Sequence, residues 1–268
     1  MAFTRRTSPE GVVWLQSALL AERGVPHGFS TRLGGESPAP FDSLNLGLAD
    51  APGEPDAWER VERNWARLLR ATGMQGRTLV RLRQVHGDVV READREKDVV
   101  RREPPFVDGD AVVTADTAQV VSVRIADCGP VLLADPEAGI VSAVHAGWRG
   151  LCAGIVIRAV ERMLARGAQG KRLVAAIGPC IGRASFEVGD EVQTAMAAVD
   201  LGPWIAPGPG GVRWRADLPG AIRAQLVLLG VPDDQIDLDD RCTVSTAELF
   251  SYRRDGAQSG RMAALIGL

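Results

Sequence analysis

The sequence predicts an α+β fold: a single domain over residues 1–268, with mixed β-sheets in a sandwich-like core flanked by helices. Strand-like apolar runs follow one another through the middle of the chain. Helical patterns lie on either side of them, without the strict alternation of a Rossmann fold. The 268 residues, 46% of them hydrophobic and 24% charged, suffice for a sizeable core without disulfides.

The first third of the chain combines turns with one clear helix. Residues 24–50 are rich in Gly, Ser, Pro and Asn, a composition that predicts turns. Residues 55–73 carry apolar side chains at helical spacing, and Gly73 is placed to end that helix. Two strand pieces with Gly87 between them follow over 78–90, and the charged stretch 91–105 predicts an exposed excursion.

The middle and the end of the chain supply further strands and helices. The near-continuous apolar runs 119–135 and 139–147 flank a Pro/Gly turn and predict a hairpin that turns at 135–139. Residues 150–166 form the clearest amphipathic pattern and predict one helix. A strand over 172–178 and a helix near 216–229 are expected further on.

Charge and composition narrow the class of partner. The net charge of −3 gives no bulk attraction to nucleic acid or to an anionic membrane. No apolar run is long enough to span a bilayer, and the N-terminus lacks the pattern of a secretory signal. The cytoplasm is therefore the expected compartment, where four scattered cysteines act as thiols, metal ligands or nucleophiles. Small molecules are the expected partners, and the oligomeric state is left open.

Three reactive side chains follow apolar strand-like runs: His86, Cys128 and His145. Strand ends of one sheet can converge on a single cleft, where catalytic residues are held by a rigid scaffold. Two imidazoles and a thiolate suit Zn²⁺ with a fourth position open, as in catalytic zinc sites. The same residues also suit a Cys128 nucleophile with a histidine base. Spacing alone does not decide between the two.

The motifs STRLGG, LNLGL, QVHG, DGDAVVT, ADCGPVLLAD, VHAGWRG, GPCIG, FEVG and SYRRDG occur in this order from Phe29 to the C-terminus. In this respect the chain resembles the YfiH-type laccase-domain family, also called polyphenol oxidase, peptidoglycan editing factor and zinc-dependent purine nucleoside phosphorylase. The resemblance implies a single domain of mixed sheets and helices. It also implies a catalytic zinc held by His86, Cys128 and His145.

The resemblance further implies phosphorolysis of adenosine, inosine and methylthioadenosine to base and ribose 1-phosphate, with adenosine deamination alongside. Phosphorolysis needs cations for phosphate, and the planar fork of arginine suits this. Arg149 is the first candidate, because it lies four residues after His145 and before a predicted helix N-terminus. Asp127, beside Cys128, is expected to orient a ligand. The candidates for substrate and phosphate binding are Arg32, Asn45, Arg149, Cys180 and Arg253.

Three alternatives stay open. A cysteine hydrolase or amidase would use Cys128 on a peptidoglycan precursor. A copper-dependent polyphenol oxidase would hold Cu²⁺ instead of zinc, but a laccase-type site needs more histidines than three. A non-enzymatic scaffold would carry a metal with four protein ligands, the fourth being His27 or Cys180. Gly129 stands where the family commonly has a large apolar residue, so a wider pocket is expected there.

Overall fold

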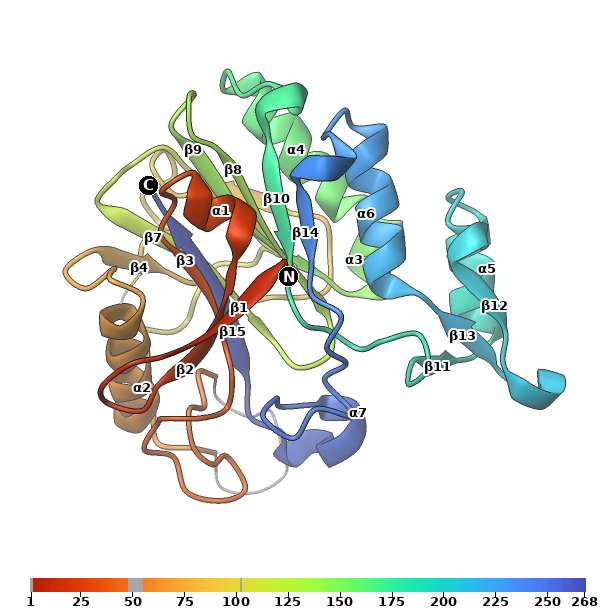
Figure 1. Cartoon of the computed structure of the whole chain (residues 1–268), viewed down its shortest axis with the longest axis horizontal. Coiled ribbons are helices and arrows are strands. Elements are labelled where there is room, and N and C mark those ends of the chain that lie inside the picture. The colour runs from red at the N-terminus through yellow and green to blue at the C-terminus, as the bar shows by residue number, and fades with distance from the viewer. Residues whose placement is uncertain (1, 48–54, 102) are drawn as a thin grey trace.

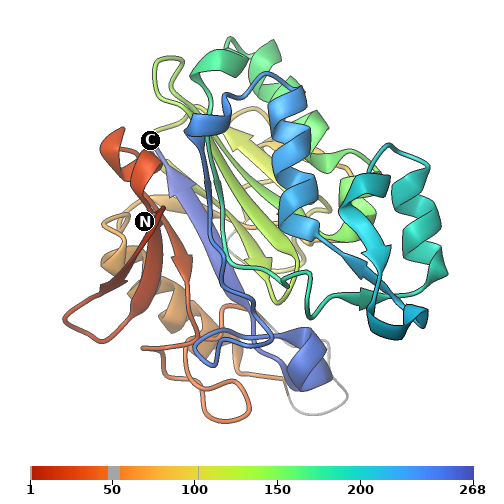
Figure 2. The same cartoon turned by 45° about the vertical axis from the view of Figure 1, so that its right-hand side comes forward.

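The computed structural model describes residues 2–47, 55–101 and 103–268, and its centre is a pair of six-stranded sheets packed face to face (Figures 1 and 2). The first sheet has the order β1 (Phe3–Thr7), β2 (Val13–Ser17), β3 (His27–Ser30), β15 (Met262–Gly267), β7 (Gln119–Ile125) and β4 (Thr78–Val80). The second has the order β14 (Ile236–Leu238), β10 (Val174–Ile177), β8 (Gly129–Asp135), β9 (Ile140–Ala146), β6 (Ala111–Thr114) and β5 (Val90–Glu92).

Both sheets are mixed. The pairs β4–β7, β5–β6 and β10–β14 are parallel, and the other pairs within the two sheets are antiparallel. A small third sheet, in the order β11 (Glu187–Val188), β13 (Trp214–Ala216) and β12 (Ile205–Pro207), extends at the right of Figure 1 beside α5 (Asp190–Ala197). The predicted fold class, mixed sheets in a sandwich flanked by helices, is confirmed.

Helices cover the outer faces of the sandwich. The first sheet packs on α2 (Trp58–Ala71), and the second on α3 (Trp148–Cys152), α4 (Ile155–Ala165) and α6 (Leu218–Leu228). The short helix α1 (Ala18–Glu22) contacts β10 and β14, and α7 (Tyr252–Asp255) lies at the lower end in Figure 1. Short 3-10 turns occupy Gly170–Arg172, Gly202–Trp204, Pro209–Gly211, Asp233–Gln235 and Gly256–Gln258.

The sandwich explains why the central strands are apolar on both faces. In β7, Val121 and Val123 point into the core between the sheets, whereas Val120 points to α2. In β9, Ala143 faces the other sheet and Val144 faces the helices. Because successive side chains alternate between faces, a strand covered on both sides is an unbroken apolar run.

Several local predictions are confirmed and others are wrong. The helix predicted before Gly73 is present as α2, which ends at Ala71, and the β8–β9 hairpin is present as well. The single helix expected over 150–166 is two helices, because Gly154 adopts a left-handed φ of +88° between α3 and α4. The turn-rich stretch 24–50 contains β3, and its last residues, 48–50, lie outside the described part of the chain. The charged stretch 91–105 was expected to be exposed, but Val99 within it is buried in the core.

The topology gathers several connections at one end of the sandwich. The β4–β5 segment crosses from the first sheet to the second, and so does the short β7–β8 segment. The end of β9 is paired with the start of β8, with Pro130 opposite His145. Three segments that are far apart in sequence therefore meet at the place where the chain changes sheets.

Candidate metal centre

The three segments at this end carry His86, Cys128 and His145. Their potential ligand atoms all lie within 4.8 Å of one another. The rings of the two histidines meet edge to face, with centroids 5.0 Å apart and an angle of 71° between their planes. His145 is buried, Cys128 is half-buried and His86 is exposed, so the group opens toward solvent on the side of His86. The structure thus brings together the three residues that the sequence predicts as metal ligands.

A buried carboxylate, Asp110 directly before β6, holds two of the three segments in place. Its Oδ1 lies 2.8 Å from Nδ1 of His145 and accepts the backbone N–H of His86 at 3.0 Å. Its Oδ2 accepts the backbone N–H groups of Val85 and Gly87 at 3.2 and 2.8 Å. With Nδ1 of His145 bound to Asp110, Nε2 is the ring nitrogen that would hold a metal ion, as carboxylates orient histidine ligands at metal sites.

The charges within the group favour a thiolate. Burial alone would raise the pKa of the Cys128 thiol, but the adjacent His145 and His86 imidazoles outweigh burial and lower that pKa to about 6. Burial likewise disfavours charge on His145, but the Cys128 thiolate and the Asp110 carboxylate raise its pKa to about 9. A thiolate and two imidazoles whose ligand atoms lie within 4.8 Å of one another are the donors that a borderline metal ion such as Zn²⁺ prefers, so this donor set fits a metal.

Close packing around the three ligands depends on a glycine. Gly147 caps the N-terminus of α3 directly after β9. A Cβ at this position would lie 2.8 Å from Sγ of Cys128 and 3.1 Å from Cδ2 of His86, closer than side-chain carbons normally approach. The glycine in the VHAGWRG motif therefore leaves room for the two ligands beside it.

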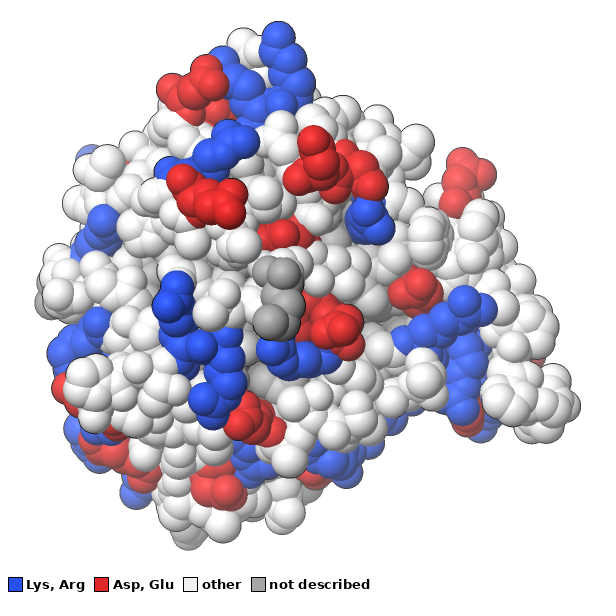
Figure 3. Space-filling model, viewed as in Figure 1, with Lys and Arg blue, Asp and Glu red and all other residues white. Residues whose placement is uncertain are grey.

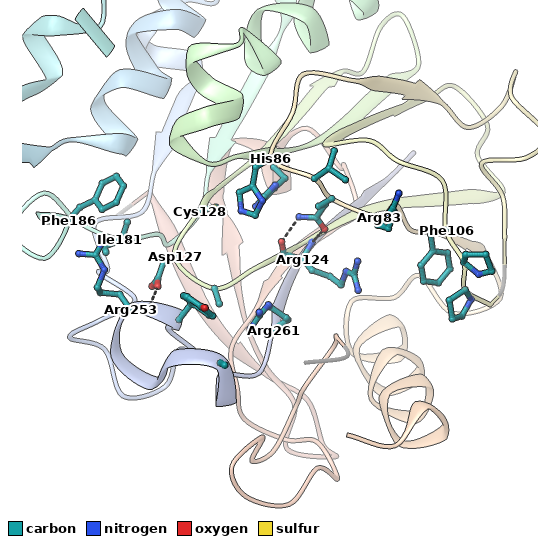
Figure 4. A pocket seen from close by; sticks show the side chains of 18 of the residues that line it. Arg83, His86, Phe106, Arg124, Asp127, Cys128, Ile181, Phe186, Arg253 and Arg261 are labelled. Atoms are coloured by element: carbon teal, nitrogen blue, oxygen red, sulfur yellow. Dashed lines mark hydrogen bonds between the residues drawn. The ribbon is translucent and has the colours of Figure 1, made fainter. Parts of the chain in front are cut away.

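The ligand group lies in a cleft of about 910 Å³. In Figure 4, His86 and Cys128 lie in the middle of this cleft, Phe186 and Arg253 at one end and Arg83 and Phe106 at the other. The described lining consists of Trp58, Arg83, Gln84, Val85, His86, Pro104, Pro105, Phe106, Arg124, Ala126, Asp127, Cys128, His145, Ile181, Phe186, Tyr252, Arg253, Ala257 and Arg261.

Two of the other candidate residues, Asp127 and Arg253, line this cleft. The Asp127 carboxylate accepts hydrogen bonds from Thr243 Oγ1 (2.5 Å), Ser251 Oγ (2.7 Å) and the Arg253 backbone N–H (2.6 Å), so it ties the C-terminal segment to the Cys128 loop. The carboxylate that contacts a histidine ligand is Asp110. Arg253 donates to the Glu187 carbonyl at 2.8 Å, and its guanidinium lies 5.6 Å from the Phe186 ring centroid.

The remaining candidates lie outside the cleft lining. Arg32 donates to the Asp42 carbonyl at 2.7 Å, and the buried Asn45 accepts the backbone N–H of Arg261 at 2.9 Å. Arg149 is exposed within α3 rather than before it, and its guanidinium lies 4.2 Å from the Trp148 ring centroid. Cys180 is buried, which raises its pKa well above that of an ordinary thiol.

The two candidates for a fourth protein ligand are placed elsewhere. His27 lies in β3, where its Nε2 accepts the Ser17 backbone N–H at 2.9 Å and its Nδ1 lies 2.8 Å from the Val25 carbonyl oxygen. The described group of potential ligand atoms contains His86, Cys128 and His145 without His27 or Cys180. The coordination shell that the scaffold alternative requires is therefore not formed by either residue.

Gly129 does not widen the cleft. It is the first residue of β8 and is buried, and a Cβ built on it would lie 2.4 Å from Cδ1 of Ile222 in α6. The side chain of Ile222, from the helices that cover the second sheet, fills the space beside Gly129. The expectation of a wider pocket at this position is wrong for that reason.

Sequence reasoning assigned no role to several residues that shape the site. Asp110 belongs to the DGDAVVT motif. Its position directly before an apolar strand is the sequence feature that could have marked it as a site residue. Gln84, in QVHG, exchanges two hydrogen bonds with the Arg124 backbone, at 2.7 and 2.8 Å. Arg124 in β7 and Arg261 directly before β15 line the cleft from positions far apart in sequence, so no local pattern marks them.

The charge distribution on the surface and the length of the helices bear on the kind of partner. Basic and acidic side chains are intermixed on the face shown in Figure 3. None of the helices in the described ranges is both long and apolar enough to cross a membrane.

Comparison with known proteins identifies relatives over most of the chain. Residues 26–268 match the family described as multi-copper polyphenol oxidoreductase laccase. A Deinococcus radiodurans protein named purine nucleoside phosphorylase is 43% identical over 244 residues, covering 91% of this chain and 89% of that protein. The Escherichia coli K12 protein named purine nucleoside phosphorylase YfiH is 40% identical over 247 residues, with 92% and 95% covered.

Solved structures of family members have the same fold as this chain. The crystal structure of the Bacillus licheniformis hypothetical protein YfiH matches with a TM-score of 0.86 at 28% identity and covers 98% of both chains. YlmD from Geobacillus stearothermophilus gives 0.85 at 30% identity, covering 99% of this chain and 98% of that one. The family match and the fold together place the chain among laccase-domain proteins. The chain belongs to the YfiH-type laccase-domain family.

Proposed function

We propose that this protein is a zinc-dependent purine nucleoside phosphorylase. The observation that carries the proposal is the convergence of His86, Cys128 and His145 ligand atoms within 4.8 Å, inside a cleft lined by several arginines. The names of the relatives in Deinococcus radiodurans and Escherichia coli support the substrate class. Adenosine, inosine and methylthioadenosine are the proposed nucleosides.

In the proposed reaction, an oxygen of hydrogen phosphate donates an electron pair to C1′ of the ribose while the C1′–N9 bond breaks. The electron pair of that bond leaves with the purine. The proton that hydrogen phosphate loses appears on the purine nitrogen, so the products are the free base and ribose 1-phosphate. The positive charge that develops on the ribose is stabilised by the approaching phosphate dianion.

The chain's own residues bind and orient the reactants. His86, Cys128 and His145 would hold the zinc ion, which when bound supplies Lewis-acid chemistry at the centre of the cleft. Asp110 fixes the ring of His145 and the backbone of the His86 loop. Ile181 and Phe186 give one end of the cleft an apolar wall that suits a purine. The arginines of the lining supply positive charge for phosphate.

The proposal extends to adenosine deamination at the same site. In that reaction water replaces the amino group at C6, giving inosine and ammonia.

Zinc rather than Cu²⁺ is proposed because the chain has three histidines, and the third, His27, has both ring nitrogens within hydrogen-bonding distance of backbone groups. A copper oxidase needs more imidazoles than the remaining two.

A cysteine hydrolase is the second candidate, favoured by one observation. The lowered pKa of Cys128, about 6 beside His145, is typical of a thiolate nucleophile paired with an imidazole. A thiolate that holds a metal is a poor free nucleophile. Metal content therefore separates the two candidates.

We also propose the cytoplasm as the compartment and one domain over 1–268. Cys128, Cys152, Cys180 and Cys242 are all free thiols, as expected in a reducing compartment. The segment before the family match contributes β1 and β2 to the first sheet, which supports one domain.

The test is an assay of adenosine with and without inorganic phosphate. Wild-type protein should release purine base only with phosphate, with adenine and hypoxanthine together equal in amount to ribose 1-phosphate. His145→Ala should lose bound zinc and turnover together, whereas Arg223→Gln, which removes an exposed ion pair with Asp233, should keep both. Metal-free protein with an alkylatable Cys128 and no nucleoside turnover would favour the hydrolase.

A further inference from the structure

We infer that Asp127 is a positioning residue that fixes the Cys128 thiolate relative to the two histidine ligands. The inference rests on the proposed function only in that it takes Cys128 as a ligand of the proposed metal ion. Figure 4 shows Asp127 between Cys128 and Arg253, with its bond to Arg253 drawn dashed. Asp127 would act through the backbone that it shares with Cys128, whereas Asp110 contacts a ligand ring directly.

The chain crosses from the first sheet to the second in a very short connection beside Cys128. Only residues 126–128 lie between the end of β7 and the start of β8. Directly after them, Gly129 is paired with Ala146 of β9, which fixes the backbone on one side of Cys128. The backbone on the other side is that of Asp127, so its conformation decides where the thiolate lies.

Asp127 has a backbone conformation that residues other than glycine rarely adopt. Its φ is +95°, in the left-handed region, where Asp and Asn are tolerated better than most other side chains. In the described part of the chain, three residues other than glycine have a positive φ, and two of them are His86 and Asp127. Such conformations persist only where the surrounding structure holds them. The backbone at His86 is held by Asp110, and the backbone at Asp127 needs an equivalent support.

The Asp127 carboxylate provides that support. Its Oδ1 accepts hydrogen bonds from Thr243 Oγ1 at 2.5 Å and Ser251 Oγ at 2.7 Å, and its Oδ2 accepts the Arg253 N–H at 2.6 Å. Thr243 and Ser251 are fully buried, so loss of the carboxylate would leave two buried hydroxyls without this acceptor. The Asp127 carbonyl also accepts the N–H of Ile181 at 2.9 Å. One residue thus binds two distant segments to the loop that carries Cys128.

The position of Cys128 matters because the ligand group is compact. The potential ligand atoms lie within 4.8 Å of one another, and a Cβ on Gly147 would lie 2.8 Å from the Cys128 sulfur. A shift of the loop would change the distance from this sulfur to the ring nitrogens of His86 and His145. Metal–ligand bonds tolerate little change in length, so residues that orient ligands contribute strongly to metal affinity.

Cobalt substitution tests the position of the sulfur, because the thiolate-to-cobalt charge-transfer absorption depends on how the sulfur meets the metal. Asp127→Gly allows the left-handed backbone but removes the carboxylate. It should shift and weaken this absorption and weaken zinc binding about 10–100-fold. Asp127→Asn keeps one acceptor oxygen and should change both less.

A variant farther from the metal ligands keeps the test independent of changes at position 127. Thr243→Val removes one donor to the Asp127 carboxylate at nearly constant volume and should shift the absorption in the same direction as Asp127→Gly. Thr246→Val is the matched control, because it is the same change three residues further along, at a hydroxyl that is not one of the three donors to Asp127. It should keep the wild-type spectrum and zinc affinity.

The outcomes separate this inference from the proposed function. Wild-type spectra and zinc affinity in Asp127→Asn and Thr243→Val, whether or not Asp127→Gly folds, would overturn the positioning role and keep the function. Zinc-loaded wild type without phosphate-dependent turnover would overturn the function alone, since the cobalt spectra still test Asp127. If wild type binds neither metal, the alkylation rate of Cys128, read by peptide mapping, decides: a changed rate in Thr243→Val but not in Thr246→Val supports the role, and equal rates refute it.

Discussion

The Asp110 carboxylate is where the metal centre and the fold meet at the scale of single residues. It is fully buried, and both of its oxygens are used: Oδ1 for the His145 ring and the His86 backbone, Oδ2 for the backbone of Val85 and Gly87. Burial would raise the pKa of Asp110, but the His145 ring and the Gly87 N–H outweigh it and lower that pKa. The group is therefore an anion that orients two ligands at once.

Replacing this anion tests its orienting role. Asp110→Asn should weaken zinc binding about 10–100-fold, because one acceptor oxygen becomes a donor and His145 loses its charged partner. The measurement is competition with a chromogenic zinc chelator. Asp233→Asn, an exposed carboxylate paired with Arg223, is the matched control and should bind zinc like wild type. Equal zinc affinity in Asp110→Asn and wild type would refute the role.

His27 links stability to pH. Burial lowers its pKa in the folded state, where Nε2 accepts the Ser17 N–H, so the folded protein keeps the ring neutral. The unfolded chain takes up a proton as the pH falls through about 6.5, and this favours unfolding. The stability that His27 contributes is therefore full above pH 6.5 and declines below it.

Urea unfolding at pH 7.5 and 5.5 measures this loss. The unfolding free energy of wild type should fall more than that of His27→Gln, by at most about 1.4 kcal/mol for each pH unit below 6.5. The difference between the two proteins removes the contributions of all other groups. Parallel pH dependence in wild type and variant would contradict the assignment.

The residues of the ligand group were predictable from sequence, but their supports were not. His86, Cys128 and His145 are rare, reactive side chains after apolar runs. Asp110 is one of many acidic residues, and its contact with His145 spans 35 positions. Arg149 looked suitable from its place in the sequence, yet its side chain is exposed outside the cleft lining.

At the scale of elements, the β9–α3 junction shapes the site. The strand ends one residue after His145, and Gly147 then turns the chain into α3 against Cys128 and His86. Periodicity predicted the long helix α2 and the hairpin of β8 and β9 because each has an uninterrupted pattern. It did not reveal the break between α3 and α4, since apolar residues continue on both sides of Gly154.

Filling the space at Gly147 tests the junction. Gly147→Ala should fold but bind zinc more weakly, because its methyl group would displace the Cys128 Sγ that lies 2.8 Å away. Zinc content after dialysis against a weak chelator is the measurement. Gly202→Ala, whose new carbon would meet its nearest neighbour at an ordinary 3.8 Å, should retain zinc as wild type does. Retention of zinc by both variants would show that the junction tolerates the methyl group.

At the scale of the whole molecule, the two sheets share one core, and stability should depend on it. Leu132 is 0% exposed in the core between the sheets, whereas Leu228 at the end of α6 is 85% exposed. Leu132→Ala should cost about 2–5 kcal/mol of unfolding free energy, and Leu228→Ala less than about 0.5 kcal/mol. Denaturant unfolding of both variants measures the difference, and similar losses would contradict the sandwich core.

The sandwich class was predictable because strands and helices that do not alternate strictly favour a sandwich over a doubly wound sheet. The cleft was not, since its lining depends on how distant segments pair, as with Arg124 in β7 and Arg261 directly before β15. Register depends on tertiary packing, which no single stretch of sequence specifies.

The central claim is that a zinc ion on His86, Cys128 and His145 makes this protein a nucleoside phosphorylase. The most direct measurement is a titration of metal-free protein with zinc, following adenine release from adenosine in phosphate buffer. The account predicts that activity rises in proportion to added zinc and reaches a plateau at about one zinc ion per chain, as expected for one catalytic site. Full adenine release by the metal-free protein, or restoration by Cu²⁺ and not by zinc, would contradict it.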